Sequence, residues 1–196
     1  MKSTLAILFS AVLGLAAPSV PAPDAFPYRL KITSANEKYN GKYISTNGSF
    51  VGIFRTGAST PLQVYAVQGS SGLVELRTYP ESQSSQSLVL LGGENDNLAL
   101  TTIHNPAAAT FPRGTTCDWT SFKLGGGNPP AAGRGDNVVT YARAKSGDTF
   151  SVTDYGARSG TAVQLRRGDL YHIDISFPVT ITYERVTDSS DEYTIM

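Results

Sequence analysis

The sequence predicts an all-β domain of about eleven or twelve strands, because short apolar runs are separated by turn residues throughout. From Phe26 onward no stretch keeps a sustained helical period of 3.6 residues. Two segments, Tyr28–Thr33 and Leu73–Tyr79, instead alternate apolar and polar residues, which puts their apolar side chains on one face of a strand. Glycine, asparagine and aspartate cluster between the runs, as in tight turns. We therefore expect sequential antiparallel strands in one domain.

The expected strands are residues 28–33, 42–45, 62–67, 73–79, 88–91, 98–103, 138–142, 149–153, 162–166, 170–175 and 179–186. Three dipeptides favour the positive φ angles of hairpin turns, namely Asn47-Gly48, Gly147-Asp148 and Gly168-Asp169. The stretch 125–136 is rich in glycine and proline, which suit neither the pairing nor the packing of a central strand. We interpret it as a long surface loop inside one domain, the alternative being a linker between two half-domains.

The N-terminus has the pattern of a secretory signal peptide. Lys2 precedes an uncharged apolar run from Leu5 to Ala16 that is shorter than the about 20 residues of a membrane-spanning helix. We divide the chain into a signal peptide (1–16), a proline-rich leader (17–25), an all-β domain (26–187) and an acidic tail (188–196). The protein is therefore expected to be secreted, without membrane insertion.

The charge and the cysteine content limit the expected partners and the expected sources of stability. The formal net charge is zero, with 16 basic and 16 acidic side chains, so nothing attracts a nucleic acid over long range. Cys117 is the only cysteine, which excludes a disulfide within the chain and leaves packing to stabilise the exported domain. We expect a monomer in which Cys117 is a buried apolar residue, the alternatives being an interchain disulfide or a reactive thiol.

Residues for catalysis and metal binding are sparse. The two histidines, His104 and His172, accompany no Gly-x-Ser-x-Gly elbow, and no histidine or cysteine cluster has ligand spacing. We expect no metal and no cofactor, and interpret the oxygen-rich stretch 92–97 as a polar turn rather than a calcium loop. A glycosidase would need two facing carboxylates. The sequence cannot pair its candidates, which are Glu75, Glu94, Asp118, Asp154, Asp169 and Asp174.

A faint internal repeat suggests an architecture. Residues 59–65 (STPLQVY) and 160–166 (GTAVQLR) share a small-residue turn, an apolar residue and a glutamine. Residues 41–50 and 160–166 resemble strand-turn units of β-trefoils, and the second is similar to the Gln-x-Trp repeat of ricin B-type lectins. The resemblance implies a single β-trefoil-like domain, with a β-sandwich as the alternative. It carries no sugar site over, because the acidic position falls on Ser151 and Phe50.

A second resemblance is to small secreted fungal proteins of the phialide cell-wall and IgE-binding type. It rests on residues 28–35 (YRLKITSA), 47–52 (NGSFVG) and 98–105 (LALTTIHN), although the cysteines of that family are absent. The resemblance implies an extracellular or wall-associated protein without catalysis.

Together these features favour a secreted, non-catalytic recognition protein that binds glycans or cell-surface glycoproteins. Tyrosine and tryptophan rings can stack on sugars, and polar turn residues can bond their hydroxyl groups. The candidate binding residues are Trp119, Asp154, Tyr155 and Gln164. A small glycoside hydrolase with a carboxylate pair and a structural surface protein without a specific ligand are the alternatives.

Two short motifs are expected at the surface, a glycosylation sequon and an Arg-Gly-Asp triplet. Asn47-Gly48-Ser49 is an N-glycosylation sequon on an expected hairpin tip. Arg134-Gly135-Asp136 lies in the expected surface loop, where it could present a cation and a carboxylate to an adhesion receptor.

Overall fold

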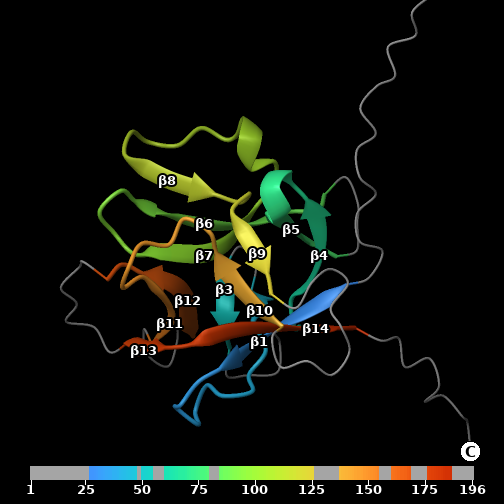
Figure 1. Cartoon of the computed structure of the whole chain (residues 1–196), viewed down its shortest axis with the longest axis vertical. Coiled ribbons are helices and arrows are strands. Elements are labelled where there is room, and N and C mark those ends of the chain that lie inside the picture. The colour runs from blue at the N-terminus through green and yellow to red at the C-terminus, as the bar shows by residue number, and fades with distance from the viewer. Residues whose placement is uncertain are drawn as a thin grey trace, which may run out of the picture.

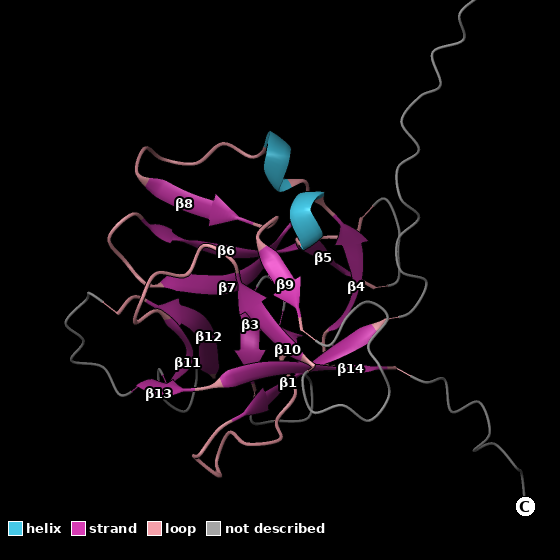
Figure 2. Cartoon of the chain, viewed as in Figure 1, coloured by secondary structure: helices cyan, strands magenta, loops and turns pink. Residues whose placement is uncertain are grey.

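The computed structural model describes residues 27–47, 50–54, 60–79, 84–125, 137–154, 160–168 and 176–186. These residues form fourteen strands, all of whose pairings are antiparallel, and two single-turn 3-10 helices (Figures 1 and 2). The all-β prediction is confirmed. The signal peptide, the leader, the acidic tail and the Arg134-Gly135-Asp136 triplet lie outside the described residues.

Six of the strands pair in a closed ring. They are β1 (Tyr28–Thr33), β4 (Gln63–Gln68), β5 (Val74–Thr78), β9 (Phe122–Leu124), β10 (Val138–Tyr141) and β14 (Thr180–Arg185). Each pairs with the next in this order, and β14 pairs back onto β1 with Tyr28 opposite Arg185. Figure 1 shows this junction of the first and last strands at the lower right. Every ring strand thus has a hydrogen-bonded neighbour on both sides, which removes the exposed edge of an open sheet.

Three hairpins are inserted between ring strands. They are β2 (Ser45–Asn47) with β3 (Phe50–Ile53), β6 (Ser87–Gly93) with β7 (Leu98–Ile103), and β11 (Thr149–Asp154) with β12 (Thr161–Arg166). Their second strands pair with one another, β3 with β7, β7 with β12 and β12 with β3. The chain therefore repeats the order ring strand, hairpin, ring strand three times, and we name these repeats unit one (β1–β4), unit two (β5–β9) and unit three (β10–β14).

The remaining elements are short. β8 (Thr115–Asp118) pairs with β6, and β13 (Ser176–Pro178) pairs with β11, each just before its unit returns to the ring. The helix η1 (Ser70–Gly72) lies between β4 and β5, in the connection from unit one to unit two. The helix η2 (Pro106–Ala108) lies between β7 and β8, within unit two. Figure 2 shows both helices on the side of the molecule that carries β5 and β8.

One continuous core joins the ring and the hairpins. In β1 the alternation expected from the sequence is observed, because Tyr28, Leu30 and Ile32 are buried while the residues between them are half-buried. Tyr28 also packs edge-on against Tyr183 of β14, with ring centroids 5.4 Å apart. The same cluster of buried apolar side chains includes Phe150 and other hairpin residues, so the hairpins close the end of the ring.

The expected strands agree with the structure where the apolar pattern is long. Strands β3, β8, β9 and β13 are not among the expected ranges, because each is only three or four residues long. The expected strand 42–45 overlaps β2 only at Ser45. The hairpin at Asn47 is confirmed, since Asn47 pairs with Phe50. The prediction of a hairpin at Gly147-Asp148 is wrong, because β10 pairs with β9 and β14 whereas β11 pairs with β12 and β13. The expected strand 170–175 lies outside the described residues.

The internal repeat does not relate equivalent strands. Gln63 begins β4, a ring strand that pairs with β1 and β5. Gln164 lies in β12, the second strand of a hairpin. The similarity between the two segments reflects a common turn-to-strand pattern and not a shared position, although the chain does repeat its strand order three times.

Asp148 ties the start of β11 to the end of β12. Its Oδ1 accepts a hydrogen bond from the backbone N–H of Gly168 (3.1 Å), and its Oδ2 accepts from the backbone N–H of Lys145 and from Arg167 Nη1 (both 3.0 Å). Gly147 has φ +89°, and a Cβ on Gly168 would lie 2.5 Å from the carbonyl carbon of Gly147. Both glycines are therefore required by this close approach of two turns.

We predict that Asp148→Asn lowers the free energy of unfolding at pH 7 by about 2 kcal/mol, because it weakens charge-assisted hydrogen bonds. Burial alone would raise the pKa of Asp148, but the bonds from Lys145, Gly168 and Arg167 outweigh it and lower the pKa. The stabilisation is therefore present above about pH 4 and is lost as the pH falls through the lowered pKa.

Urea denaturation of both proteins at pH 7 and below pH 3 tests this prediction. The stability difference should shrink in acid. The matched control is Asp96→Asn in the exposed β6–β7 turn, which should change stability little at either pH. An unchanged difference between wild type and Asp148→Asn across this range would contradict the proposed role of the charge.

Candidate functional site

A polar pocket of about 330 Å³ lies on the outer side of unit two. We name it the Trp119 pocket, and its described lining residues are Glu75, Arg77, Ser85, Ser87, His104, Asn105, Pro106, Ala107 and Trp119. Strand alternation explains one wall. Val74 and Leu76 of β5 face the core. Because side chains alternate along a strand, Glu75 and Arg77 face the opposite side and line the pocket.

The Glu75–Arg77 pair forms the charged wall of this pocket. Arg77 Nη2 donates to Glu75 Oε2 (2.9 Å), and Ser87 Oγ, opposite Arg77 on the neighbouring strand, donates to Glu75 Oε1 (2.5 Å). The hydrogen bond from Arg77 and the nearby charge of Glu75 raise the pKa of Arg77, against a smaller opposing effect of burial. Arg77 Nε is buried and makes no hydrogen bond within the described part of the chain. The wall therefore holds a carboxylate in a fixed position beside a guanidinium.

The opposite wall follows the end of β7. Asn105 has φ +45° and ψ +65°, a left-handed conformation that asparagine tolerates better than most residues. Its carbonyl accepts from the backbone N–H of Ala108 (3.0 Å), and Pro106 occupies the first position of η2. This turn brings His104 and Asn105 to line the pocket.

Trp119 follows β8 directly, is half-buried and lines the pocket. Its neighbour Asp118 holds the segment in place. Asp118 Oδ1 accepts from the backbone N–H of Thr120 (3.0 Å), and Oδ2 accepts from Ser121 Oγ (2.8 Å) and Tyr141 Oη (3.0 Å). Burial, and next the charge of Asp118, raise the pKa of Tyr141, so this phenol remains a donor.

The pocket combines an aromatic surface with converging polar groups. Such a set can bind a hydroxylated ring, whose C–H face packs on the indole while its hydroxyl groups bond the carboxylate and guanidinium. Glycoside hydrolysis requires a second carboxylate across the bond that is cleaved. Among the described lining residues Glu75 is the one carboxylate, and both of its oxygens accept hydrogen bonds already.

Of the four candidate binding residues, the structure places Trp119 in this pocket and Asp154 and Gln164 elsewhere. Asp154 accepts from Lys38 Nζ (2.5 Å) at the end of β11, and Tyr155 lies outside the described residues. Gln164 is 6% exposed and donates from Nε2 to Thr153 Oγ1 (2.6 Å). Its side chain therefore supports the β11–β12 hairpin.

The rest of the Trp119 pocket was missed as a site from the sequence. Glu75 stood among the candidate carboxylates and His104 among the candidate catalytic bases, but nothing in the sequence related them to Trp119. The sequence of β5 did contain a signal for this site, because Glu75 and Arg77 alternate with the core residues Val74 and Leu76 and therefore share one polar face of the strand.

Cys117 lies half-buried on β8, opposite Leu91 of β6. Burial raises the pKa of its thiol, and the charge of Asp118 adds to the effect. This environment disfavours the thiolate, which is the reactive form of cysteine. The described residues include no group of three or more histidine, cysteine, aspartate or glutamate side chains that could hold a metal ion.

Comparison of the chain with protein families, curated proteins and solved structures finds no match. No helix in the described ranges is long and apolar enough to cross a membrane.

We predict that Cys117 of the folded protein reacts with a disulfide reagent such as DTNB at pH 8 several times more slowly than it does in urea. The reason is the raised pKa together with partial burial, which both lower the accessible thiolate. Absorbance of the released thiolate measures the rate. Equal rates in the folded and the unfolded protein would contradict the structural assignment of Cys117.

Proposed function

We propose that this protein recognises saccharides through the Trp119 pocket and does so without catalysis. One observation carries the proposal: a tryptophan ring lines the same polar pocket as a carboxylate and a guanidinium that are fixed by each other. Because Glu75 and Arg77 neutralise each other, we propose an uncharged sugar as the ligand. The partner is then a glycan or the sugar of a cell-surface glycoprotein.

The polar groups of the pocket include both hydrogen-bond acceptors and donors, as the hydroxyl groups of a sugar require. Glu75 accepts hydrogen bonds, the guanidinium of Arg77 is a donor, and Ser85 lines the same pocket. Ser87 keeps the carboxylate in one orientation, which lowers the entropy lost when a ligand binds. The half-buried Trp119 is the aromatic residue of the pocket, and an aromatic ring can supply the apolar contact that distinguishes a sugar face from water.

We further propose that the three-unit arrangement is a β-trefoil. The ring of six strands, the three hairpins and the mutual pairing of β3, β7 and β12 support it. In a β-sandwich the strands would instead divide into two sheets packed face to face. The trefoil makes the Trp119 pocket a feature of one unit, which leaves corresponding places in the other two.

The cellular setting is proposed from the N-terminal sequence. The charged start and apolar run of residues 1–16 support export, and the resemblance to secreted fungal wall proteins supports association with a cell wall. A monomer acting outside the cell, without nucleic-acid partners, suits the neutral charge. A glycoside hydrolase and a ligand-free structural protein remain the competing functions.

A glycan array and pull-down with wall polysaccharides should identify a retained saccharide. We expect Trp119→Ala to weaken its binding about tenfold, because the stacking surface is lost. Glu75→Gln, which keeps the shape but removes the charged acceptor, should weaken binding as well. Titration calorimetry of each variant with the retained saccharide measures the effect.

The matched control is Tyr79→Ala, which removes a 44% exposed aromatic ring outside the Trp119 pocket. It should bind as the wild type does. Retention on no glycan, or wild-type affinity of Trp119→Ala, would refute the proposal. Release of reducing sugar that Glu75→Gln abolishes would establish the hydrolase instead.

Expression in a eukaryotic secretory host tests export and glycosylation. We expect secreted protein that begins at Ala17 and carries a glycan on Asn47, an exposed residue at the end of β2. Mass spectrometry before and after enzymatic deglycosylation should show the change, and Asn47→Gln should remove it. Retention of the intact N-terminus inside the cells would argue against the signal peptide.

A further inference from the structure

Asp118 stands directly before Trp119 in the chain and closes a short turn around it. Its Oδ1 accepts a hydrogen bond from the backbone N–H of Thr120 (3.0 Å), so the backbone is held on both sides of Trp119. Its Oδ2 accepts from Ser121 Oγ (2.8 Å). The direction in which the Trp119 side chain leaves the backbone therefore depends on where the carboxylate of Asp118 lies.

Unit three supplies further partners to this carboxylate. Asp118 is buried, and a buried carboxylate is costly in free energy unless hydrogen bonds and an opposite charge satisfy it. Tyr141 Oη of β10 donates to Oδ2 (3.0 Å), and Arg143 Nη1 lies 3.2 Å from the same oxygen. The backbone N–H of Ala142, between these two residues, donates to the carbonyl of Ser121 (2.8 Å). The end of β10 is therefore bonded to both ends of the segment 118–121.

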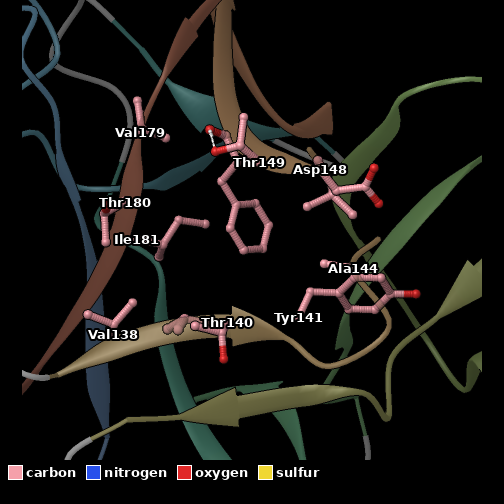
Figure 3. A pocket seen from close by; sticks show the side chains of 12 residues that line it. Val138, Thr140, Tyr141, Ala144, Asp148, Thr149, Val179, Thr180 and Ile181 are labelled. Atoms are coloured by element: carbon pink, nitrogen blue, oxygen red, sulfur yellow. Dashed lines mark hydrogen bonds between the residues drawn. The ribbon is translucent and has the colours of Figure 1, made fainter. Parts of the chain in front are cut away.

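The ring of Tyr141 is held in place without its hydroxyl. It packs against Phe122 of β9, the residue opposite it in the sheet, with ring centroids 6.4 Å apart. In the hollow between β10, β11 and β14, its hydroxyl points away from Val138 and Ile181 (Figure 3). The phenol therefore reaches the carboxylate from a packed position on a ring strand.

Tyr141 and Arg143 are not among the described residues that line the Trp119 pocket. Any effect that they have on a molecule in this pocket therefore passes through Asp118 and Trp119. An aromatic ring that is already ordered loses less entropy when a ligand binds than a ring that must first be ordered. The affinity of the pocket should therefore depend on how firmly the segment 118–121 is held.

We propose that Tyr141 and Arg143 are positioning residues of the Trp119 pocket, which fix Trp119 in place by holding the carboxylate of Asp118. Their effect on saccharide binding rests on the function proposed above. Their effect on Trp119 itself is measurable without a saccharide. One unit of the fold thus orders the aromatic residue of a pocket that lies on another unit.

Trp119 is the only tryptophan of the chain, so tryptophan fluorescence reports on this one side chain. Tyr141→Phe removes the hydroxyl and keeps the packed ring, whereas Arg143→Gln removes the charge. We expect acrylamide to quench Trp119 more strongly in Tyr141→Phe than in the wild type, and time-resolved anisotropy to show faster rotation of the indole. Arg143→Gln should change both quantities less, because the arginine side chain is 70% exposed and its ion pair is screened by water.

The matched control is Tyr183→Phe, at a buried tyrosine of β14. The hydroxyl of Tyr183 donates to the carbonyl of Gly125, which follows β9, whereas Ser121 precedes that strand. This variant also loses one buried hydrogen bond and should lose a similar amount of stability, but quenching and anisotropy of Trp119 should stay as in the wild type. All proteins are measured under conditions in which circular dichroism shows them folded. If Tyr141→Phe does not fold, Arg143→Gln decides the test.

Unchanged quenching and anisotropy in the folded unit-three variants would overturn the proposal, as would equal changes in Tyr183→Phe. With the saccharide that the wild type retains on the array, calorimetry should show binding to Tyr141→Phe weakened about threefold to tenfold. Wild-type affinity of that variant would also count against the proposal. If no glycan is retained, the saccharide proposal fails, and the fluorescence of Trp119 still decides whether unit three positions this residue.

Discussion

The pairing of the first described strand with the last holds the architecture together. All six residues of β1 have partners in β14, so the ring of six strands is closed by the two ends of the domain. Without that pairing, β1 and β14 would each expose a row of backbone donors and acceptors. The buried face of the ring also supports the three hairpins, since their apolar side chains belong to the same core. The Trp119 pocket lies against this frame.

Unit three supports the segment that bears Trp119. Tyr141 of β10 donates from its hydroxyl to Asp118 Oδ2, and Asp118 also accepts from Thr120 and Ser121, which directly follow Trp119. One buried hydrogen bond therefore connects the second and third units next to the pocket.

The fold class could be predicted because apolar alternation is a local property of the chain. β1 and β7 are read directly from YRLKIT and LALTTI. The strands β8, β9 and β13 could not be predicted, since a strand of three or four residues shows too little alternation and depends on the neighbours it meets. The turn at Gly147-Asp148 has hairpin residues, yet tertiary pairing directs its two flanking strands to different partners. For the site, Trp119 was predicted and its surroundings were not, because the pocket collects residues from several separate elements.

The order in which the strands are made has a consequence for how the domain reaches its native state. The backbone N–H of Val186 bonds the carbonyl of Pro27 (2.8 Å), next to the β1–β14 pairing. A growing chain can form the hairpins early, but it cannot close the ring until its C-terminal strand has been synthesised. Contacts of such long sequence separation fold slowly. The last strand to be synthesised therefore decides when the domain becomes complete, because β1 and β14 can pair only after residues 180–185 have been made.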